Sequence, residues 1–242
     1  MAFASLIDLK DSYTEGHSRH VRDLTRQFLE YLKVSSREIE EITSAAELHD
    51  IGKIGIPDSI LKKPGKLTEK EFLEIKKHPI RGADALKSLQ GFDGVSKIIR
   101  HHHERYDGTG YPDGLVADKI PFGSRVLSII DAHDAMIYSR PYRKAMKEKD
   151  ALKIMEEEAG KQFDPLLVLK FVKFLQQKDI YSQYDPVCGM AVNSQQSLFN
   201  VIYKRETYIF CSQVCLTEFN NFPEKYIAAS QEKNNPEDKP YG

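Results

Sequence analysis

The two residue types that most often bind transition metals occupy separate parts of this chain. All eight histidines lie at or before His133, whereas all three cysteines lie at or after Cys188. The sequence therefore predicts two separate metal-binding units, which 242 residues can accommodate as one core and a small appendage.

Composition narrows the classes of partner. With 40% hydrophobic and 29% charged residues, the chain is typical of a soluble globular protein. A formal net charge of −1 gives no field that would attract a nucleic-acid polymer, so an anionic substrate would need local positive charge. The N-terminus lacks a signal-peptide pattern, and no run approaches the roughly 18 apolar residues of a membrane span. We therefore expect a cytoplasmic protein without a membrane partner.

Apolar residues recur at helical spacing through the first part of the chain. Val21, Leu24 and Phe28 fall on one helical face, and Ser35 offers the N-cap of a second helix. Thr68 opens a capping box, and its helix carries His78. Because no convincing strand is evident here, the first unit is predicted to be all-α. The expected helices cover residues 12–32, 36–49, 68–78 with a bend or restart at 79, 95–104, 122–138, 150–159 and 165–175.

The pattern changes after Gln176. Residues 198–203 and 207–210 are rich in aromatic and β-branched side chains, which predicts two short strands, and residues 212–221 have a helical pattern. The predicted fold class is an all-α helical domain followed by a small α+β, ββα-like cysteine domain. The expected boundaries are 1–178 for the first domain, 184–228 for the second and 229–242 for a polar, disordered tail.

Histidine and carboxylate ligands gather in the first domain. His49-Asp50 ends the second predicted helix, and His102-His103 follows roughly fifty residues later. Asp50 could bridge two divalent ions, because each of its oxygens can serve one ion. Adjacent histidines on a helix point in divergent directions, which favours a pair that straddles two neighbouring ions. Two such ions can hold the attacking and leaving oxygens of a phosphoryl displacement, so no side-chain nucleophile is needed.

Several sequence blocks resemble the HD-GYP family in their order and spacing. They are Tyr13-Thr14-x-x-His17, Leu48-His49-Asp50-Ile51-Gly52-Lys53-Ile54-Gly55-Ile56-Pro57, His78-Pro79, His102-His103-Glu104-Arg105-x-Asp107-Gly108-x-Gly110-Tyr111-Pro112, Asp131-x-x-Asp134-Ala135-Met136, Ser139-Arg140-Pro141-Tyr142-Arg143 and Phe163-Asp164-Pro165. The resemblance covers about residues 3–175. It implies an all-helical HD fold and metal-dependent hydrolysis of cyclic diguanylate (c-di-GMP) to linear pGpG, often followed by conversion to GMP.

The resemblance also implies roles by position. Asp50 and Lys53 would serve catalysis, and Tyr111 would line the guanine or phosphate pocket. Lys53, Arg140 and Arg143 would grip the phosphates of the dinucleotide, although a solvated surface charge is the ordinary role of any lysine or arginine. The implied metal ligands are His17, His49, Asp50, His78, His102, His103 and Asp131.

The ligand set bears on the number and kind of ions. Family members that hold three ions carry a Glu four residues before the first His ligand, where this chain has Tyr13. We therefore expect two ions. Iron or manganese suits five histidines better than magnesium, which prefers oxygen ligands.

Three further histidines are expected to be bystanders. Counting back from Glu104 assigns the ligand pair to His102 and His103, which leaves His101 packed or exposed. His20 and His133 lie near proposed ligands but belong to none of the quoted blocks. Asp134 could either orient a histidine or make a hydrogen bond on the helix surface.

A second resemblance lies in the cysteine domain. The blocks Asp185-Pro186-Val187-Cys188-Gly189-Met190, Tyr208-Ile209-Phe210-Cys211-Ser212-Gln213-Val214-Cys215 and Pro223-Glu224-Lys225-Tyr226 resemble the YHS domain, a relative of the TRASH metal-binding modules. So small a domain benefits from a metal staple. Cys188, Cys211 and Cys215 could meet at one thiophilic ion of the Zn or Cu type, with Asp185, Met190, water or another group as the fourth ligand. Alternatively, the three cysteines merely pack as small apolar side chains.

The sequence favours one function and leaves two others open. The favoured one is a cyclic-dinucleotide phosphodiesterase whose cysteine module couples metal status to turnover. The alternatives are a non-catalytic cyclic-dinucleotide receptor and a metal-trafficking or sensing protein that uses the helical domain as a platform. The sequence leaves open whether the substrate is c-di-GMP or the mixed guanine-adenine cyclic dinucleotide. It also leaves open whether the chain forms a homodimer or binds a signalling-protein partner.

Overall fold

The computed structural model describes residues 17–138, 145–188, 191–193, 197–204 and 206–227. Two compact units make up the chain, Met1–Val172 and Lys173–Gly242. None of the described helices has the length and apolar character needed to cross a bilayer. The expected tail at 229–242 lies outside the described residues.

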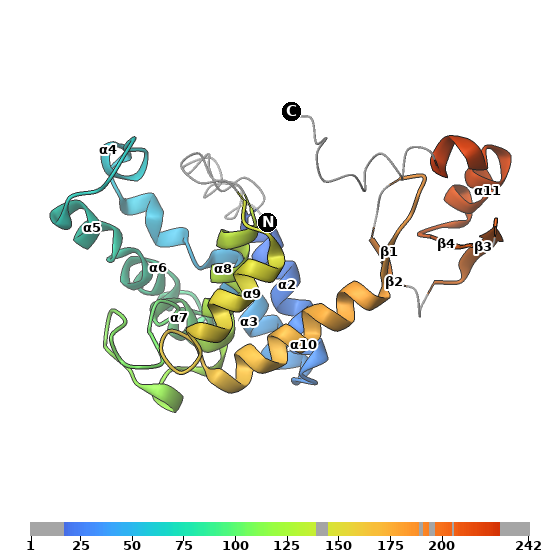
Figure 1. The fold of residues 1–242 in the computed structure, drawn as a ribbon. Helices are drawn as coiled ribbons and strands as arrows, with labels where there is room; N and C mark the ends of the chain where they lie inside the picture. The colour runs from blue at the N-terminus through green and yellow to red at the C-terminus, as the bar shows by residue number, and fades with distance from the viewer. Residues whose placement is uncertain (1–16, 139–144, 189–190, 194–196, 205, 228–242) are drawn as a thin grey trace. The chain divides into compact units, whose positions relative to one another are not determined.

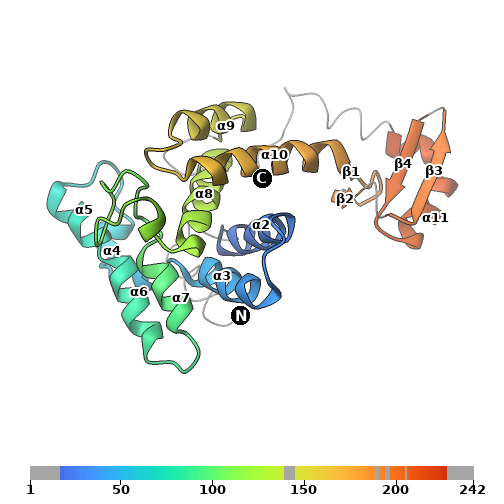
Figure 2. The ribbon, with the colours of Figure 1, turned by 90° about the horizontal axis from the view of Figure 1, so that it is seen from below.

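The regular elements of the first unit are all helices among its described residues, as its apolar periodicity predicted. Its elements are α2 (His17–Tyr31), α3 (Ser36–Leu48), the 3-10 turn η1 (Ile51–Gly55), α4 (Asp58–Leu61), α5 (Glu69–Ile75), α6 (His78–Lys87), α7 (Asp93–Arg100), the 3-10 turn η2 (Ala117–Lys119), α8 (Phe122–Ile137), α9 (Glu148–Glu157) and the start of α10 (Pro165–Tyr181), a helix that continues past Val172 into the second unit. In both views α2 runs beside α3, and α6 runs beside α7 (Figures 1 and 2).

Local sequence signals account for several helix ends. The Ser35 side chain accepts a hydrogen bond from the Glu38 amide and caps α3. Thr68 and Glu71 form the complete capping box expected at the start of α5. The helix then stops, and α6 begins at His78 with Pro79 in its first turn, where a missing amide hydrogen costs nothing.

Two helix ends lie four or more residues from their expected positions. The helix expected over 95–104 ends at Arg100, so His102 and His103 lie in the turn that follows it. The last helix of the unit, expected over 165–175, continues to Tyr181. Periodicity locates a helix better than it locates its ends, because capping contacts decide where the helix stops.

The core of the first unit lies between α2, α3, α7, α8 and α10. The ring of Phe28 on α2 packs edge-on against that of Phe171 on α10, with centroids 5.1 Å apart. Other fully buried side chains of this core include Val21, Leu29, Ile99, Leu127 and Ile130. These apolar contacts hold together the helix ends that carry the histidines.

The second unit combines two hairpins and a helix. β1 (Ser182–Tyr184) pairs with β2 (Ala191–Asn193), and β3 (Phe199–Tyr203) pairs with β4 (Glu206–Phe210), both in antiparallel fashion. α11 (Gln213–Asn221) follows, and Phe210, Cys215 and Phe219 form the buried cluster. The predicted ββα part is thus confirmed. The short β1–β2 hairpin was not predicted, because three-residue strands carry little periodic signal.

Candidate metal centres

Seven side chains with metal-ligand chemistry converge in the helical unit from five separate segments. They form two groups, His17–His49–Asp50 and His78–His102–His103, within each of which one potential ligand atom per residue lies within 4.8 Å of the others. The seventh residue, Asp131 on α8, joins the first group, because its Oδ1 lies 3.3 Å from Nε2 of His17. The structure thus brings together every residue predicted as a ligand in this domain.

Asp50 lies between the two groups. Its Oδ2 is 3.4 Å from Nε2 of His49, and its Oδ1 is 3.5 Å from Nε2 of His78. One oxygen therefore faces each group, which is the arrangement that a carboxylate needs to bridge two cations. The side chain is buried, so both oxygens are directed by their surroundings and not by bulk water.

Three of the histidines are oriented by the same local device. His49, His78 and His102 each use Nδ1 to donate a hydrogen bond to the backbone carbonyl three residues earlier. The acceptors are the carbonyls of Ala46 at 2.8 Å, Ile75 at 2.8 Å and Ile99 at 2.6 Å. Each of these carbonyls lies in the last turn of a helix, where carbonyls lack a helical amide partner. A carbonyl can only accept, so the proton resides on Nδ1 and the lone pair of Nε2 faces the centre.

His17 is oriented by a carboxylate. Its Nδ1 donates to Oδ2 of Asp134 at 2.6 Å, which leaves Nε2 directed toward Asp131. The open question about Asp134 is thereby answered, since it contacts a predicted ligand and does not make an isolated surface bond. A helix brings residues three apart onto one face, so Asp131 and Asp134 reach the same histidine.

His102 and His103 belong to the same group. Their rings lie 4.0 Å apart and His103 lies 5.0 Å from the ring of His78. A pair that straddles two ions was expected from a helix at this position, but the turn after α7 directs both imidazoles to one side. The turn geometry therefore replaces the helical geometry on which that expectation rested.

The pKa values of the buried histidines shift in opposite directions in the two groups. Desolvation lowers the pKa of His78 to about 4 and that of His103 to about 3, and it also lowers the pKa of His102. These imidazoles are neutral at pH 7 and can act as ligands. Burial also disfavours charge on His17, but hydrogen bonds to Asp131 and Asp134 outweigh it and raise the pKa of His17 to about 10.

The carboxylates stay ionised despite burial. Desolvation opposes charge on Asp50, yet Lys53 and His49 hold its pKa well below the usual range. The pKa of Asp131 is likewise lowered, because the hydrogen bond from His17 outweighs desolvation. The neutral imidazoles of the second group, together with the ionised carboxylates of Asp50 and Asp131, form a donor set that fits divalent transition-metal ions.

Two further residues adjoin this centre. Nζ of Lys53 lies 2.7 Å from Oδ2 of Asp50. The Tyr111 ring lies 5.0 Å from that of His103, and its backbone amide donates to the His103 carbonyl. Burial, together with the charges of Asp131 and Asp50, raises the pKa of Tyr111, so its hydroxyl keeps its proton.

Close backbone packing brings Asp50 next to His78. Gly52 in η1 lies against α6 so closely that a Cβ would lie 2.6 Å from the Gly82 amide nitrogen and closer still to the His78 carbonyl oxygen. Only glycine permits this approach. The glycine of the His-Asp-x-Gly segment is therefore part of how the two ligand groups meet.

The loop after His103 is held by a buried carboxylate. Both oxygens of Glu104 accept backbone amides, from Asp113 at 2.7 Å and Leu115 at 3.1 Å. A Cβ at Gly110 would collide with the backbone of Glu104, so this position also requires glycine. These contacts place Tyr111 beside the centre, and sequence reasoning had not assigned a role to Glu104.

The remaining predicted residues have different outcomes. The imidazole of His101 makes hydrogen bonds through Nδ1 to the Lys97 carbonyl and through Nε2 to Asp113 at 3.0 Å, which fits its expected place outside the ligand set. His20 stacks on Tyr138, and His133 packs against Phe171. Tyr13, Arg140, Arg143 and Met190 lie outside the described residues.

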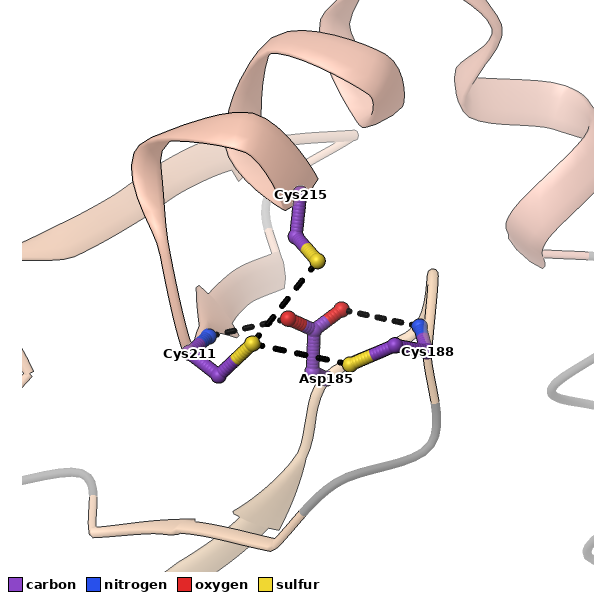
Figure 3. Close-up of side chains that lie close together, drawn as sticks. All are labelled: Asp185, Cys188, Cys211 and Cys215. Atoms are coloured by element: carbon purple, nitrogen blue, oxygen red, sulfur yellow. Dashed lines mark hydrogen bonds between the residues drawn. The ribbon is translucent and has the colours of Figure 1, made fainter.

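The second unit gathers its three cysteines around one carboxylate (Figure 3). Sγ of Cys211 lies 3.5 Å from Sγ of Cys188 and 3.7 Å from Sγ of Cys215. Thiolates on one tetrahedral ion with bonds of about 2.3 Å would be about 3.8 Å apart, so these spacings fit a metal centre. The three cysteines are free thiols.

Asp185 is fully buried and connects the loops that carry two of these cysteines. Its Oδ1 accepts the amides of Val187 at 2.8 Å and Cys188 at 3.3 Å, and its Oδ2 accepts the Cys211 amide at 2.9 Å. In Figure 3 the carboxylate lies between the two loops, and Cys215 reaches toward Cys211 from α11. Burial raises the pKa of the Cys215 thiol to about 12.

Comparison with protein families gives two matches on this chain. A family model described as "HD domain" matches residues 2–167 and so includes all seven converging ligands. A model described as "YHS domain" matches residues 184–230 and includes the three cysteines.

Curated relatives resemble the helical unit. The chain is 42% identical over 188 residues to the cyclic di-GMP phosphodiesterase response regulator RpfG of Xanthomonas campestris pv. campestris, covering 77% of this chain and 48% of that protein. It is 38% identical over 181 residues to a cyclic di-GMP phosphodiesterase of Thermotoga maritima, with 74% and 49% covered. It is 40% identical over 164 residues to the 3'3'-cGAMP-specific phosphodiesterase 3 of Vibrio cholerae, with 68% and 36% covered. The chain spans about half or less of the length of these relatives.

Solved structures share the helical architecture. An HDG"Y"P protein from Bdellovibrio bacteriovorus has a TM-score of 0.54 at 26% identity, with 66% of this chain and 51% of that chain covered. The HD domain of the phosphodiesterase PgpH from L. monocytogenes, solved in complex with cyclic-di-AMP, has a TM-score of 0.54 at 18% identity, with 76% and 98% covered. At that identity the second likeness shows the fold alone.

Proposed function

Because the chain belongs to the HD-GYP branch of the HD domain family, we propose that it is a metal-dependent phosphodiesterase that hydrolyses c-di-GMP. It also carries a YHS domain. The products would be pGpG and, after a second hydrolysis, GMP. The observation that carries the proposal is the position of Asp50, which presents one oxygen to His49 in its own ligand group and the other to His78 in the second group.

The ligands divide between two ions. His17, His49 and Asp131 would hold one ion, His78, His102 and His103 would hold the other, and Asp50 would contact both. Five imidazoles and two carboxylates favour iron or manganese over magnesium. When bound, the two ions would activate water and withdraw negative charge from the phosphoryl group.

The chain's own residues prepare this chemistry. The carbonyl-bound histidines keep Nε2 unprotonated and aimed at the centre without any rearrangement. Lys53, paired with Asp50, adds positive charge beside the reacting phosphate. Tyr111 retains its hydroxyl proton and can donate it in a hydrogen bond to a phosphoryl oxygen. Arg140 and Arg143 are proposed to bind phosphate on the strength of the family pattern alone.

A paired activity and metal assay tests this function. Protein purified without oxygen is analysed for bound metals and incubated with c-di-GMP and with the mixed guanine-adenine dinucleotide, and products are separated by chromatography. Asp50→Asn should abolish turnover. His101→Gln should retain turnover, because that imidazole is bonded to Asp113 away from the centre. Tight dinucleotide binding without product from the wild-type protein would instead identify a receptor.

For the second unit we propose binding of a thiophilic ion such as Zn²⁺ or Cu⁺ by Cys188, Cys211 and Cys215, with an effect on turnover in the helical unit. The sulfur spacings support one shared ion. Both oxygens of Asp185 already accept amides, which favours a role in positioning the cysteine loops over a role as fourth ligand. Cys211→Ser and Cys215→Ser should change activity measured with saturating catalytic metal. Unchanged activity would separate the two units and favour a metal-trafficking role for the cysteines.

A further inference from the structure

The ammonium group of Lys76 is held between two aromatic rings at the edge of the helical unit's metal centre. Its Nζ lies 5.0 Å from the centroid of the Phe72 ring and 4.9 Å from that of the Tyr111 ring. Both separations are within the range of a cation–π interaction. Phe72 comes from α5, and Tyr111 comes from the loop that follows the His102-His103 turn, so the lysine joins two segments that are distant in sequence.

Lys76 has no carboxylate partner among the described residues, whereas three basic residues near it in sequence do. Lys63 pairs with Glu71 at 2.7 Å, Lys77 pairs with Glu74 at 2.6 Å, and Arg81 also pairs with Glu74. Aromatic rings orient a cation without neutralising its formal charge. This side chain therefore presents an uncompensated positive charge.

That charge lies close to the proposed reaction site. The Tyr111 ring that contacts Lys76 also packs 5.0 Å from the ring of His103, and Lys76 is two residues before His78. Both histidines belong to the same ligand group. Tyr111 is thus a contact that Lys76 shares with His103, one of the proposed ligands.

A cyclic dinucleotide has two phosphodiester groups, and only one of them can occupy the ions during a single hydrolysis. The other carries a negative charge that must leave water when the ligand binds, and it needs a cationic partner. Lys53 is engaged with Asp50 and so acts at the ions. Building on the proposed function, we propose that Lys76 binds the second, non-reacting phosphate of the cyclic dinucleotide, and that Phe72 and Tyr111 hold its ammonium group in place for this contact.

The aromatic clamp has a physical purpose in this arrangement. A free lysine side chain loses about 2 kcal/mol of rotamer entropy when it is fixed, whereas one already held by two rings loses less upon binding. Phe72 is 47% exposed, which is unusual for a ring that serves only the core. Its position over the lysine gives that exposure a role in ligand binding.

Steady-state kinetics with two substrates tests the assignment. The substrates are c-di-GMP and bis(p-nitrophenyl) phosphate, which has one phosphodiester and no second phosphate. Lys76→Met keeps an apolar side chain between the rings but removes the charge, Lys76→Arg keeps the charge, and Lys77→Met is the control, since Lys77 faces Glu74. Equilibrium binding of c-di-GMP is measured in parallel.

Lys76→Met should raise KM and Kd for c-di-GMP by about 10- to 100-fold, the loss expected for a hydrogen bond to a charged group, with kcat within about twofold. It should leave bis(p-nitrophenyl) phosphate hydrolysis unchanged. Lys76→Arg should restore most of the affinity, and Lys77→Met should behave as wild type. Unchanged c-di-GMP affinity in Lys76→Met, or equal loss with both substrates, would overturn the assignment. If the wild-type protein binds c-di-GMP without cleaving it, the proposed function is wrong. The Kd values of wild type and Lys76→Met for c-di-GMP would still decide the role of Lys76.

Discussion

The close contact of Gly52 with α6 allows a quantitative test of how the two ligand groups are brought together. In Gly52→Ala the new Cβ would lie 2.6 Å from the Gly82 amide nitrogen, whereas such atoms do not approach closer than 3.0 Å. The separation between η1 and α6 must therefore grow by at least 0.4 Å, and by more at the closer His78 carbonyl oxygen. Because Asp50 and His78 lie on the two sides of this contact, their 3.5 Å separation would increase with it.

The expected cost follows from the precision that such sites need. Catalytic groups must be held within about 0.5 Å of their working geometry, and a displacement of about 1 Å can reduce turnover about 100-fold. We expect Gly52→Ala to lower kcat for c-di-GMP by about 10- to 100-fold. The purified variant should also contain less bound metal than the wild-type protein. Overpacking should also destabilise the unit by about 1–3 kcal/mol, which thermal unfolding would report.

Two glycines provide matched controls. A Cβ at Gly55 would meet only the flexible side chain of Arg81 at 3.3 Å, so Gly55→Ala should be close to wild type. A Cβ at Gly82 would lie 3.2 Å from the Gly52 amide nitrogen, so Gly82→Ala should be intermediate. The graded order keeps the test informative even if Gly52→Ala folds poorly. Equal kcat and equal metal content in all three variants would refute the reasoning.

Three other measurements probe the positioning residues and the thiols. Asp134→Ala removes the acceptor for Nδ1 of His17 and should weaken metal binding by about 10- to 100-fold, as measured by titration with Mn²⁺. A Mn²⁺ affinity equal to that of the wild-type protein would show that His17 needs no orienting partner. Asp185→Ala leaves three backbone amides without their acceptor and should weaken Co²⁺ binding to the cysteines by a similar factor, as measured by thiolate charge-transfer absorbance. Glu224→Ala, on the surface of the same unit, should leave Co²⁺ binding unchanged, and an equal loss in both variants would argue against a specific role for Asp185. The pKa of Cys215 is raised to about 12 and that of Cys211 is also raised, so both thiols are protonated at pH 7 and binding of an ion should release at least two protons. The affinity for the ion should then increase about 100-fold from pH 6.5 to 7.5. Calorimetry in buffers of different ionisation enthalpy would contradict this if it detected no proton release.

Local signals allowed much of the fold to be predicted. The capping box at Thr68 and the N-cap at Ser35 are formed as expected, because they depend only on residues within one turn. Helix ends were less predictable. The helix expected to carry His102 and His103 stops at Arg100, and its end depends on contacts with the loop that follows.

The ligand residues could be recognised from their spacing and family pattern, but their orientation could not. The carbonyl bonds to His49, His78 and His102 exist because each histidine falls just past the end of a helix, and helix ends were the least certain part of the prediction. A search for histidines one to three residues after the end of a helix would have found this arrangement. The aromatic clamp around Lys76 had no such signal, since Phe72 and Tyr111 belong to segments far apart in sequence.

The amino-acid sequence by itself determined which chemistry this protein can perform, because residue type decides whether a side chain offers nitrogen, oxygen or sulfur to a cation, and its order along the chain separates the imidazoles from the thiols. Only the tertiary structure decided how those donors are used. Packing of Gly52 against α6 sets Asp50 between two ligand groups, and buried Asp185 joins two cysteine loops. Such contacts join residues separated by many positions, and their geometry follows from the packing of whole helices and loops, which no local pattern encodes.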